Sequence, residues 1–237
     1  MMATGNLASN KKFFFLTAAL YALFSVSHAT DITTKEPMQI NENFASQDIA
    51  WFKQCLANKK LIAALKNIKL IICDVDGTLT DAHVYVSSEG EGGRLFSTQD
   101  GFIVKHILSA GIKIAMISGK DNQSTIQRGK KLKITDDMLI VGMDAKHDAV
   151  KQVQQRAGVS KEATLIIGDD FLDAEMRLHN MVDLYACPAN SPFYLQQAAD
   201  VIIPRHGGNG AFRLLMDLVL YINGKHFAQA LIDKTLL

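Results

Sequence analysis

The sequence has few of the features that mark several common classes of protein. The three cysteines among its 237 residues form no Cys-x-x-Cys pair, so neither a zinc site nor a disulfide framework is indicated. The formal net charge is only +1 and no long run of one sign occurs, which argues against a nucleic-acid-binding protein. The seven histidines are scattered without the spacing of metal ligands, and no internal repeat or low-complexity tract is present.

The N-terminal region lacks an apolar run of the roughly 20 residues that a membrane span needs. Two lysines precede a shorter apolar run over 13–26, and the small residues Ser27 and Ala29 follow it. This pattern predicts a secretory signal peptide over residues 1–29 and export to the periplasm or beyond. The alternatives are an upstream extension from a wrongly chosen start codon or an uncleaved anchor.

The rest of the chain divides into three segments by the pattern of its apolar and polar residues. Residues 30–66 are expected to form a polar linker followed by one or two helices. Over 67–225, short and nearly continuous apolar runs alternate with segments of helical period, which predicts an α/β domain. We expect a doubly wound, Rossmann-like parallel sheet with ligands at the carboxyl ends of its strands. Residues 226–237 are expected to form a helical tail.

One segment breaks this alternation. Residues 80–98 contain two short β-like runs around 87–93, which predicts a β-hairpin with a flexible tip. No other long insertion separates the apolar runs. The α/β domain is therefore expected to have no large cap domain of its own.

The strongest chemical signal lies at the end of the first apolar run. Asp74 and Asp76 stand two residues apart and Gly77 follows at once. Two such carboxylates would repel each other unless a hard cation such as Mg²⁺ lies between them. One Asp can attack phosphorus while the other protonates the leaving oxygen. A polar turn is the alternative; a calcium loop does not fit, because the glycine comes too early and a strand precedes it.

Further motifs follow later strands. Asp169, Asp170 and Asp173 follow the apolar run 164–167 and are candidates for a third metal ligand and for its support. One of them could instead cap a helix, because Asp favours the first helical turn.

Two weaker motifs lie between the acidic clusters. Ser118 ends another apolar run and could offer its hydroxyl to a phosphate, although serine is also an ordinary helix cap. Lys146 stands at a helix start, where a cation opposes the helix dipole, so it could neutralise a phosphoryl group or be a solvated surface lysine. The glycine-rich turn 207–210 fits either a plain loop or a mobile segment that reaches a substrate.

These motifs, in this order, resemble those of the haloacid dehalogenase superfamily. The resemblance is closer to one capless branch, the 3-deoxy-D-manno-octulosonate 8-phosphate (KDO 8-phosphate) phosphatases, and spans about residues 66–225. The residues that carry it are 74–78, Ser118, Lys146 and 168–173, together with the hairpin, 99–102 and 207–213.

The resemblance implies a magnesium-dependent phosphatase. Mg²⁺ would be held by Asp74, Asp169 and the backbone carbonyl of Asp76, while Ser118 and Lys146 would contact the phosphate. Asp170 and Asp173 would hold the metal ligands in place. The resemblance also implies a homotetramer and contacts to a small phosphorylated metabolite from Thr78, Gly119, Lys120, Asp100 and Gly101.

Three departures from the branch concern substrate recognition. Gln99, Lys120 and Asn209 stand where that branch typically has arginine, and neither lysine nor glutamine reproduces the bidentate grip of arginine on a carboxylate. The leading hypothesis is a phosphomonoester hydrolase that acts on a phosphorylated sugar acid such as KDO 8-phosphate. The alternatives are an exported phosphatase with a different small phosphorylated substrate and a non-catalytic oligomeric binding protein.

Overall fold

The computed structural model describes residues 42–143 and 145–237. The expected signal peptide over 1–29 and the linker up to residue 41 lie outside these residues. In the described ranges, no helix combines the length and the apolar character needed to cross a membrane.

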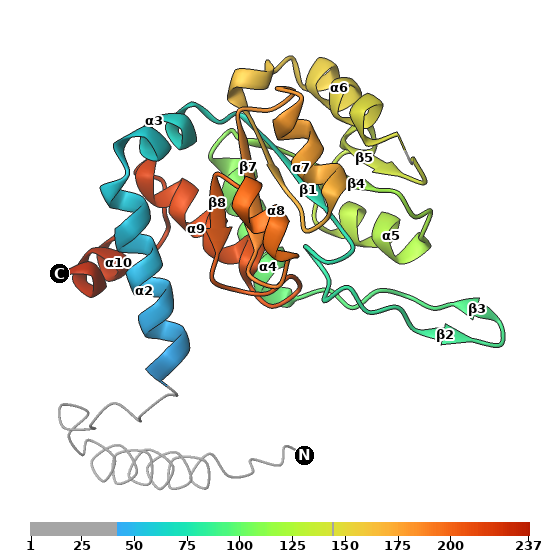
Figure 1. The fold of residues 1–237 in the computed structure, drawn as a ribbon, viewed down its shortest axis with the longest axis horizontal. Coiled ribbons are helices and arrows are strands. Elements are labelled where there is room, and N and C mark those ends of the chain that lie inside the picture. The colour runs from blue at the N-terminus through green and yellow to red at the C-terminus, as the bar shows by residue number, and fades with distance from the viewer. Residues whose placement is uncertain (1–41, 144) are drawn as a thin grey trace, which may run out of the picture. The chain divides into compact units, whose positions relative to one another are not determined.

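Six parallel strands form one sheet in the order β5-β4-β1-β6-β7-β8, which confirms the expected doubly wound fold (Figure 1). β1 lies at the centre between β4 and β6, and all five of its residues are buried. The six strands are β1 (Leu70–Asp74), β4 (Lys113–Ser118), β5 (Leu139–Val141), β6 (Thr164–Ile167), β7 (Leu184–Pro188) and β8 (Val201–Ile203).

Helices connect the strands and cover the sheet. The chain moves from β1 outward to β5 and then crosses back to β6 on the other side of β1. Because such crossovers are right-handed, α6 and α7 cover the face of the sheet opposite to the one that α4 covers. α4 packs against α9. The reversal puts a crevice at the carboxyl ends of β1 and β6, where doubly wound sheets bind their ligands. The connecting helices are α4 (Thr98–Ser109), α5 (Gln123–Lys131), α6 (Lys146–Ala157), α7 (Phe171–Leu178) and α8 (Phe193–Ala198), with short 3₁₀ turns at Asp136–Met138 and Lys161–Ala163. α9 (Ala211–Ile222) follows the last strand.

Within residues 42–143 and 145–237, two helices precede the sheet, and one more helix follows α9 near the C-terminus. α2 (Glu42–Ala57) and α3 (Lys59–Asn67) are separated at Asn58, whose side chain accepts a 3.1 Å hydrogen bond from the Leu61 amide and so starts the second helix. The indole of Trp51 donates a 2.7 Å hydrogen bond to the Ile202 carbonyl, which fixes α2 against strand β8. α10 (Gln229–Leu236) ends the chain.

The expected hairpin is present as β2 (Val86–Ser87) and β3 (Gly90–Glu91), which pair in antiparallel fashion and project from the domain (Figure 1). Tyr85 and Val86 on this arm are 71% and 68% exposed, so these apolar side chains are not covered by the described residues of the chain. The described part of the chain contains no large cap domain, as expected from the sequence.

Candidate active site

The acidic residues of two neighbouring strands converge. Asp74 is the last residue of β1, and Asp169 and Asp173 follow β6, which pairs with β1. One carboxylate oxygen from each of the three lies within 4.8 Å of the others, so together they can hold a metal ion. The parallel register explains the convergence, because adjacent parallel strands end at the same edge of the sheet.

Gly77 makes room for this convergence. Its φ is +90°, and a Cβ added there would lie 2.0 Å from Oδ2 of Asp169. Only glycine, with no side chain and free access to positive φ, fits at this position. The glycine after the two Asp residues is therefore required by the site itself as well as by the turn.

We expect Gly77→Ala to lower the catalytic activity of this site by about 10²-fold or more, because an ångström-scale displacement of a reacting group has such an effect. Gly111→Ala is the matched control, since Gly111 also has a positive φ, +80°, but faces open space. The control should lose about 1–2 kcal/mol of unfolding free energy and keep its activity. Steady-state kinetics and thermal denaturation of both variants provide the comparison, and equal activity losses would contradict this account of Gly77.

Lys146 connects the two acidic segments. It is the first residue of α6, and its Nζ lies 2.7 Å from Oδ1 of Asp74 and 2.6 Å from Oδ1 of Asp173. The lysine is only 6% exposed, so it is not a solvated surface residue. Burial alone would lower the pKa of Lys146, but Asp173 and Asp74 outweigh burial and raise it, so the ammonium stays charged.

One ammonium does not balance this group of acids. Asp74, Asp169 and Asp173 lie together, and the one ammonium of Lys146 pairs with two of them, Asp74 and Asp173. Burial raises the pKa of Asp74 well above its usual range, with Asp173 adding to the effect and Lys146 opposing it. Burial, followed by repulsion from Asp173, raises the pKa of Asp169 to about 6. A divalent cation among these oxygens would supply the missing positive charge, so the residues fit a hard-metal site.

Asp76, the second acidic residue of the first motif, contacts two polar side chains, Arg94 and Ser118. Its carboxylate accepts a short hydrogen bond from Nε of Arg94 and a 3.4 Å hydrogen bond from Oγ of Ser118. Ser118 is the last residue of β4, and this position brings its hydroxyl next to Asp76. Oγ of Ser118 also accepts a 3.2 Å hydrogen bond from the Lys120 amide, which fixes the turn that follows.

Arg94 was not among the residues that the sequence singled out. It lies on the return path of the hairpin, and its side chain is 1% exposed. Nε contacts Asp76 and Nη2 lies 3.3 Å from Glu91, while the buried Nη1 has no hydrogen-bond partner among the described residues. A buried guanidinium nitrogen without a partner beside two acids is suited to an anionic ligand.

Asp170 and Asp173 differ in burial and in the residues that they contact. The exposed Asp170 caps α7, because its carboxylate accepts a 2.6 Å hydrogen bond from the Phe171 amide. Asp173 is fully buried and contacts Lys146, and it also accepts a 3.4 Å hydrogen bond from the Asp170 amide. The helix-cap interpretation therefore applies to Asp170, and Asp173 completes the same capping box while it also contacts Lys146.

Thr78 and the glycine-rich turn pack against Asp169 and the first motif. The buried Thr78 hydroxyl donates a 3.4 Å hydrogen bond to Oδ1 of Asp169. Its carbonyl accepts a 2.9 Å hydrogen bond from the Gly208 amide, and a Cβ on Gly207 would lie 1.7 Å from the Gly77 carbonyl oxygen. The turn at 207–210 is thus packed directly on the first motif.

The other residues expected to contact the substrate differ in their surroundings. Asp100 is buried, and its carboxylate accepts hydrogen bonds from the amides of Gly210 and Arg213 at the start of α9, 3.3 and 2.8 Å long. A Cβ on Gly101 would lie 2.1 Å from Nη2 of Arg128, so this glycine makes room for the arginine. Both residues have roles in the fold, and their contact with a substrate remains a prediction. Gly119 and Lys120 are exposed beside Ser118, and Gln99 and Asn209 are exposed as well.

Two of the histidines that are scattered in the sequence meet in the fold. His147 and His179 are 32 positions apart in the sequence, yet Nε2 of His147 lies 2.9 Å from Nδ1 of His179. Glu175 completes a second group of residues that could hold a metal ion. The sequence signal that could have indicated part of this group is the i, i+4 spacing of Glu175 and His179 on one helix.

Comparison with known proteins agrees with this site. No family model matches the chain. The chain is 35% identical over 166 residues to the 3-deoxy-D-manno-octulosonate 8-phosphate phosphatase KdsC of Haemophilus influenzae, covering 68% of this chain and 87% of that protein. It is 32% identical over 165 residues to the KdsC protein of Escherichia coli K12, covering 70% of this chain and 86% of that protein.

Solved structures show the same likeness. The cobalt-bound phosphatase of Haemophilus influenzae matches with a TM-score of 0.66 and 34% identity, covering 72% of this chain and 99% of that one. The enzyme of Moraxella catarrhalis in complex with magnesium, phosphate and KDO matches with a TM-score of 0.65 and 28% identity, covering 76% and 99%.

The parallel sheet and the acidic groups at its carboxyl edge define a phosphatase of the haloacid dehalogenase superfamily. This superfamily contains many phosphoric monoester hydrolases, so the class alone leaves the substrate open. The chain belongs to the KDO 8-phosphate phosphatase family.

Proposed function

We propose that the protein hydrolyses a phosphorylated sugar acid such as KDO 8-phosphate, with Mg²⁺ and through an aspartyl-phosphate on Asp74. The observation that carries the proposal is the convergence of Asp74, Asp169 and Lys146 in one buried acidic group. The relatives are KDO 8-phosphate phosphatases, which supports this substrate. One of them binds magnesium, which supports this metal.

The metal would be held by Asp74, Asp169 and the backbone carbonyl of Asp76, with Thr78 orienting Asp169. When bound, Mg²⁺ supplies charge neutralisation and orientation of the phosphoryl group. The oxygen-rich donor set suits this hard cation.

The side chains would share the chemistry as follows. Lys146 binds Oδ1 of Asp74, so the second oxygen of Asp74 is left to attack phosphorus. Asp76 protonates the leaving oxygen and then removes a proton from the water that hydrolyses the aspartyl-phosphate. Ser118 and Lys146 position the phosphoryl group and neutralise its charge. Most of the rate enhancement would come from positioning and electrostatics.

Arg94 would contribute to binding the anionic substrate. Its unpartnered Nη1 is buried and its Nε contacts Asp76, and its guanidinium would offer an anion contact in a chain where Gln99, Lys120 and Asn209 stand at positions expected to be arginine. We expect Arg94→Gln to lower kcat/KM for KDO 8-phosphate by about 10–10²-fold, mostly through KM, because a charge-assisted hydrogen bond contributes about 1.5–3 kcal/mol. Arg156→Gln, at an exposed arginine, is the control.

The kinetics of Arg94→Gln also separate two roles of this residue. If Arg94 binds the sugar acid, the loss for KDO 8-phosphate should exceed the loss for a plain aryl phosphate. Arg94→Lys should recover only part of it, because lysine lacks the planar fork. Equal losses on both substrates would mean that Arg94 acts through Asp76 alone.

A substrate panel tests the proposed function as a whole. The protein should hydrolyse KDO 8-phosphate in preference to other sugar phosphates, and only with Mg²⁺. Strong preference for a different phosphorylated metabolite would favour the second candidate, an exported phosphatase, which the exposed Gln99, Lys120 and Asn209 motivate. No hydrolysis across the panel with Mg²⁺ bound would favour a binding protein.

We also propose that the protein forms a homotetramer through its hairpin arm. Tyr85 and Val86 expose apolar surface that gains from burial against another copy. Light scattering should give the mass of four chains for the wild type and a smaller mass for Tyr85→Ser/Val86→Ser. Ile202→Ser, at a 42% exposed residue of β8, is the control and should keep the mass unchanged. A monomeric wild type would contradict this part of the proposal.

A further inference from the structure

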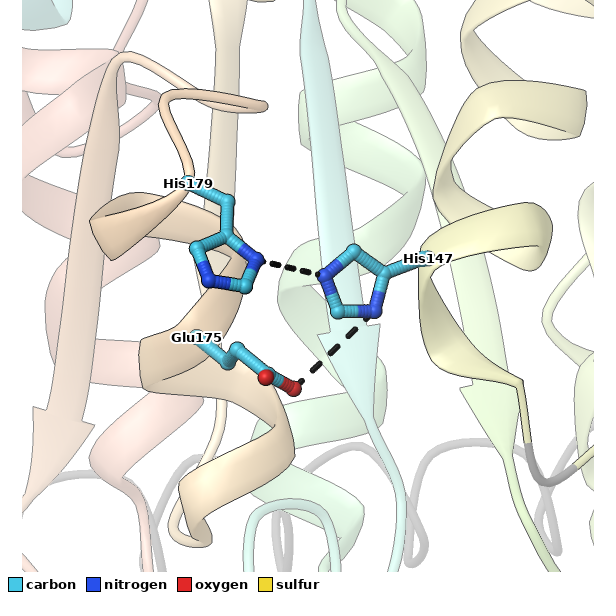
Figure 2. A group of neighbouring side chains, drawn as sticks. All are labelled: His147, Glu175 and His179. Atoms are coloured by element: carbon cyan, nitrogen blue, oxygen red, sulfur yellow. Dashed lines mark hydrogen bonds and ion pairs between the residues drawn. The ribbon is translucent and has the colours of Figure 1, made fainter.

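We propose that His147, Glu175 and His179 form a second metal site, specific for a borderline transition ion such as Zn²⁺, that joins α6 to α7. The three residues come from two adjacent helices and point toward one another (Figure 2). They are separate from the acidic group of Asp74 and Asp169, and none of them has a part in the proposed phosphatase chemistry.

The backbone brings the three ligands together. His147 lies in the first turn of α6, Glu175 lies within α7, and His179 is the residue that ends α7. Glu175 and His179 are four positions apart, so they share one face of that helix. Packing of α6 against α7 then places His147 opposite both of them.

The distances suit a metal centre. A ring nitrogen from each histidine and one carboxylate oxygen lie within 4.8 Å of one another. Nε2 of His147 is 2.9 Å from Nδ1 of His179, and Nδ1 of His147 is 3.9 Å from Oε2 of Glu175. Zinc ligands at about 2.0–2.1 Å from the ion are separated by roughly 3.3 Å in a tetrahedron. An imidazole binds an ion through one nitrogen, so the ring of His147 would turn to aim a single nitrogen at the ion in place of its two present contacts.

The ligand chemistry sets the class of ion. Two imidazoles and one carboxylate suit Zn²⁺, Co²⁺ or Ni²⁺, whereas Mg²⁺ prefers oxygen ligands alone. The side chains of His147 and Glu175 are 34% and 22% exposed, so the group is open to solvent and can keep a water as a fourth ligand. The competing arrangement is a direct histidine–histidine hydrogen bond, which needs no ion and predicts no metal affinity.

The position of the site gives it a consequence for the fold. His147 adjoins Lys146, and Glu175 lies two positions after the buried Asp173 that Lys146 contacts. An ion held by both helices would therefore fix the distance between the elements that carry these two residues. Binding to the folded state alone should raise the thermal stability of the protein.

Zinc titration of the full-length protein, freed of metals by a chelator and then saturated with Mg²⁺, tests the proposal. Calorimetry should show one Zn²⁺ bound per chain beyond the Mg²⁺, and thermal denaturation should show a higher Tm with Zn²⁺. His179→Gln should weaken Zn²⁺ binding at least tenfold and remove the increase in Tm. His83→Gln is the matched control, because His83 is exposed on the hairpin arm beside a single carboxylate.

The variants separate this site from the acidic one. His179→Gln keeps all the residues of the acidic group, so its Mg²⁺-dependent activity should match the wild type and show that it is folded. Co²⁺ as a spectroscopic probe should give a visible absorption that His179→Gln and Glu175→Gln both reduce. Equal Zn²⁺ affinity in His179→Gln and wild type, or equal Co²⁺ spectra, would overturn the proposal.

Discussion

Replacing Asp74 with asparagine is expected to lower phosphatase activity by on the order of 10⁴-fold or more, the scale seen when a nucleophile that acts with its partners is removed. The neutral amide is nearly the same size as the carboxylate but cannot form the aspartyl-phosphate. It also removes one of three acidic groups from the site. Steady-state hydrolysis of an aryl phosphate and of KDO 8-phosphate, both with Mg²⁺, measures the effect.

The matched control for this variant is Asp137→Asn, which makes the same chemical change at an exposed residue of a 3₁₀ turn. It should be as active as the wild type. The stability of Asp74→Asn should not fall, because the substitution removes a buried acid whose pKa is raised by burial. Appreciable activity in a folded Asp74→Asn protein would rule out Asp74 as the nucleophile.

Lys146→Met is expected to have the second largest effect, on both rate and stability. Removing a charge that stabilises the transferring phosphoryl group should lower kcat by about 10²–10³-fold. The methionine would also leave Asp74 and Asp173 as buried acids without their cation. Breaking a buried pair in this way costs about 3–5 kcal/mol of unfolding free energy.

Measuring Tm with and without Mg²⁺ shows whether Lys146→Met is destabilised by the lost charge or by lost side-chain packing. Because Mg²⁺ supplies positive charge to the same carboxylates, it should raise the Tm of Lys146→Met more than it raises the Tm of the wild type. Lys151→Met, at an exposed position of the same helix, should change neither kcat nor Tm. An equal increase in Tm for wild type and Lys146→Met would show that the lysine is not part of the acidic group's charge balance.

The sheet could be predicted from the sequence because its strands are buried on both faces. β1, β4 and β6 are continuous apolar runs, a pattern that buried parallel strands share and surface strands do not. Their parallel order then places residues at the strand ends, such as Asp74 and Asp169, at one edge. The convergence of the acidic residues thus follows from the fold, whereas the chemical role of each residue remains a prediction.

Arg94 and the histidine pair could not be predicted because their contacts are not local. The contact between Arg94 and Asp76 depends on the path of the hairpin arm, and a buried arginine has no distinctive sequence pattern. His147 and His179 meet only because α6 packs against α7. Periodicity shows which face of a helix is buried, but it does not show which neighbour that face meets.

The aspartates show a different limit of sequence-based prediction, since the same residue type is suited to bind a metal ion, to pair with a lysine and to cap a helix. Asp170 caps α7 and Asp100 accepts hydrogen bonds from the start of α9, although both stand in motifs that also suit ligand binding. A carboxylate that accepts backbone amides is satisfied in the same chemical way as one that binds an ion. Only the position of the donors in space separates the two.

The most direct test of the proposed mechanism is chemical trapping of the phosphorylated enzyme. Protein mixed with KDO 8-phosphate and Mg²⁺ is quenched during turnover and treated with borohydride, which reduces an aspartyl-phosphate, and the modified peptide is located by mass spectrometry. We predict modification at Asp74 alone, dependent on substrate and absent from Asp74→Asn. Turnover without modification of Asp74, or modification at Asp76 or Asp169 in its place, would contradict the mechanism.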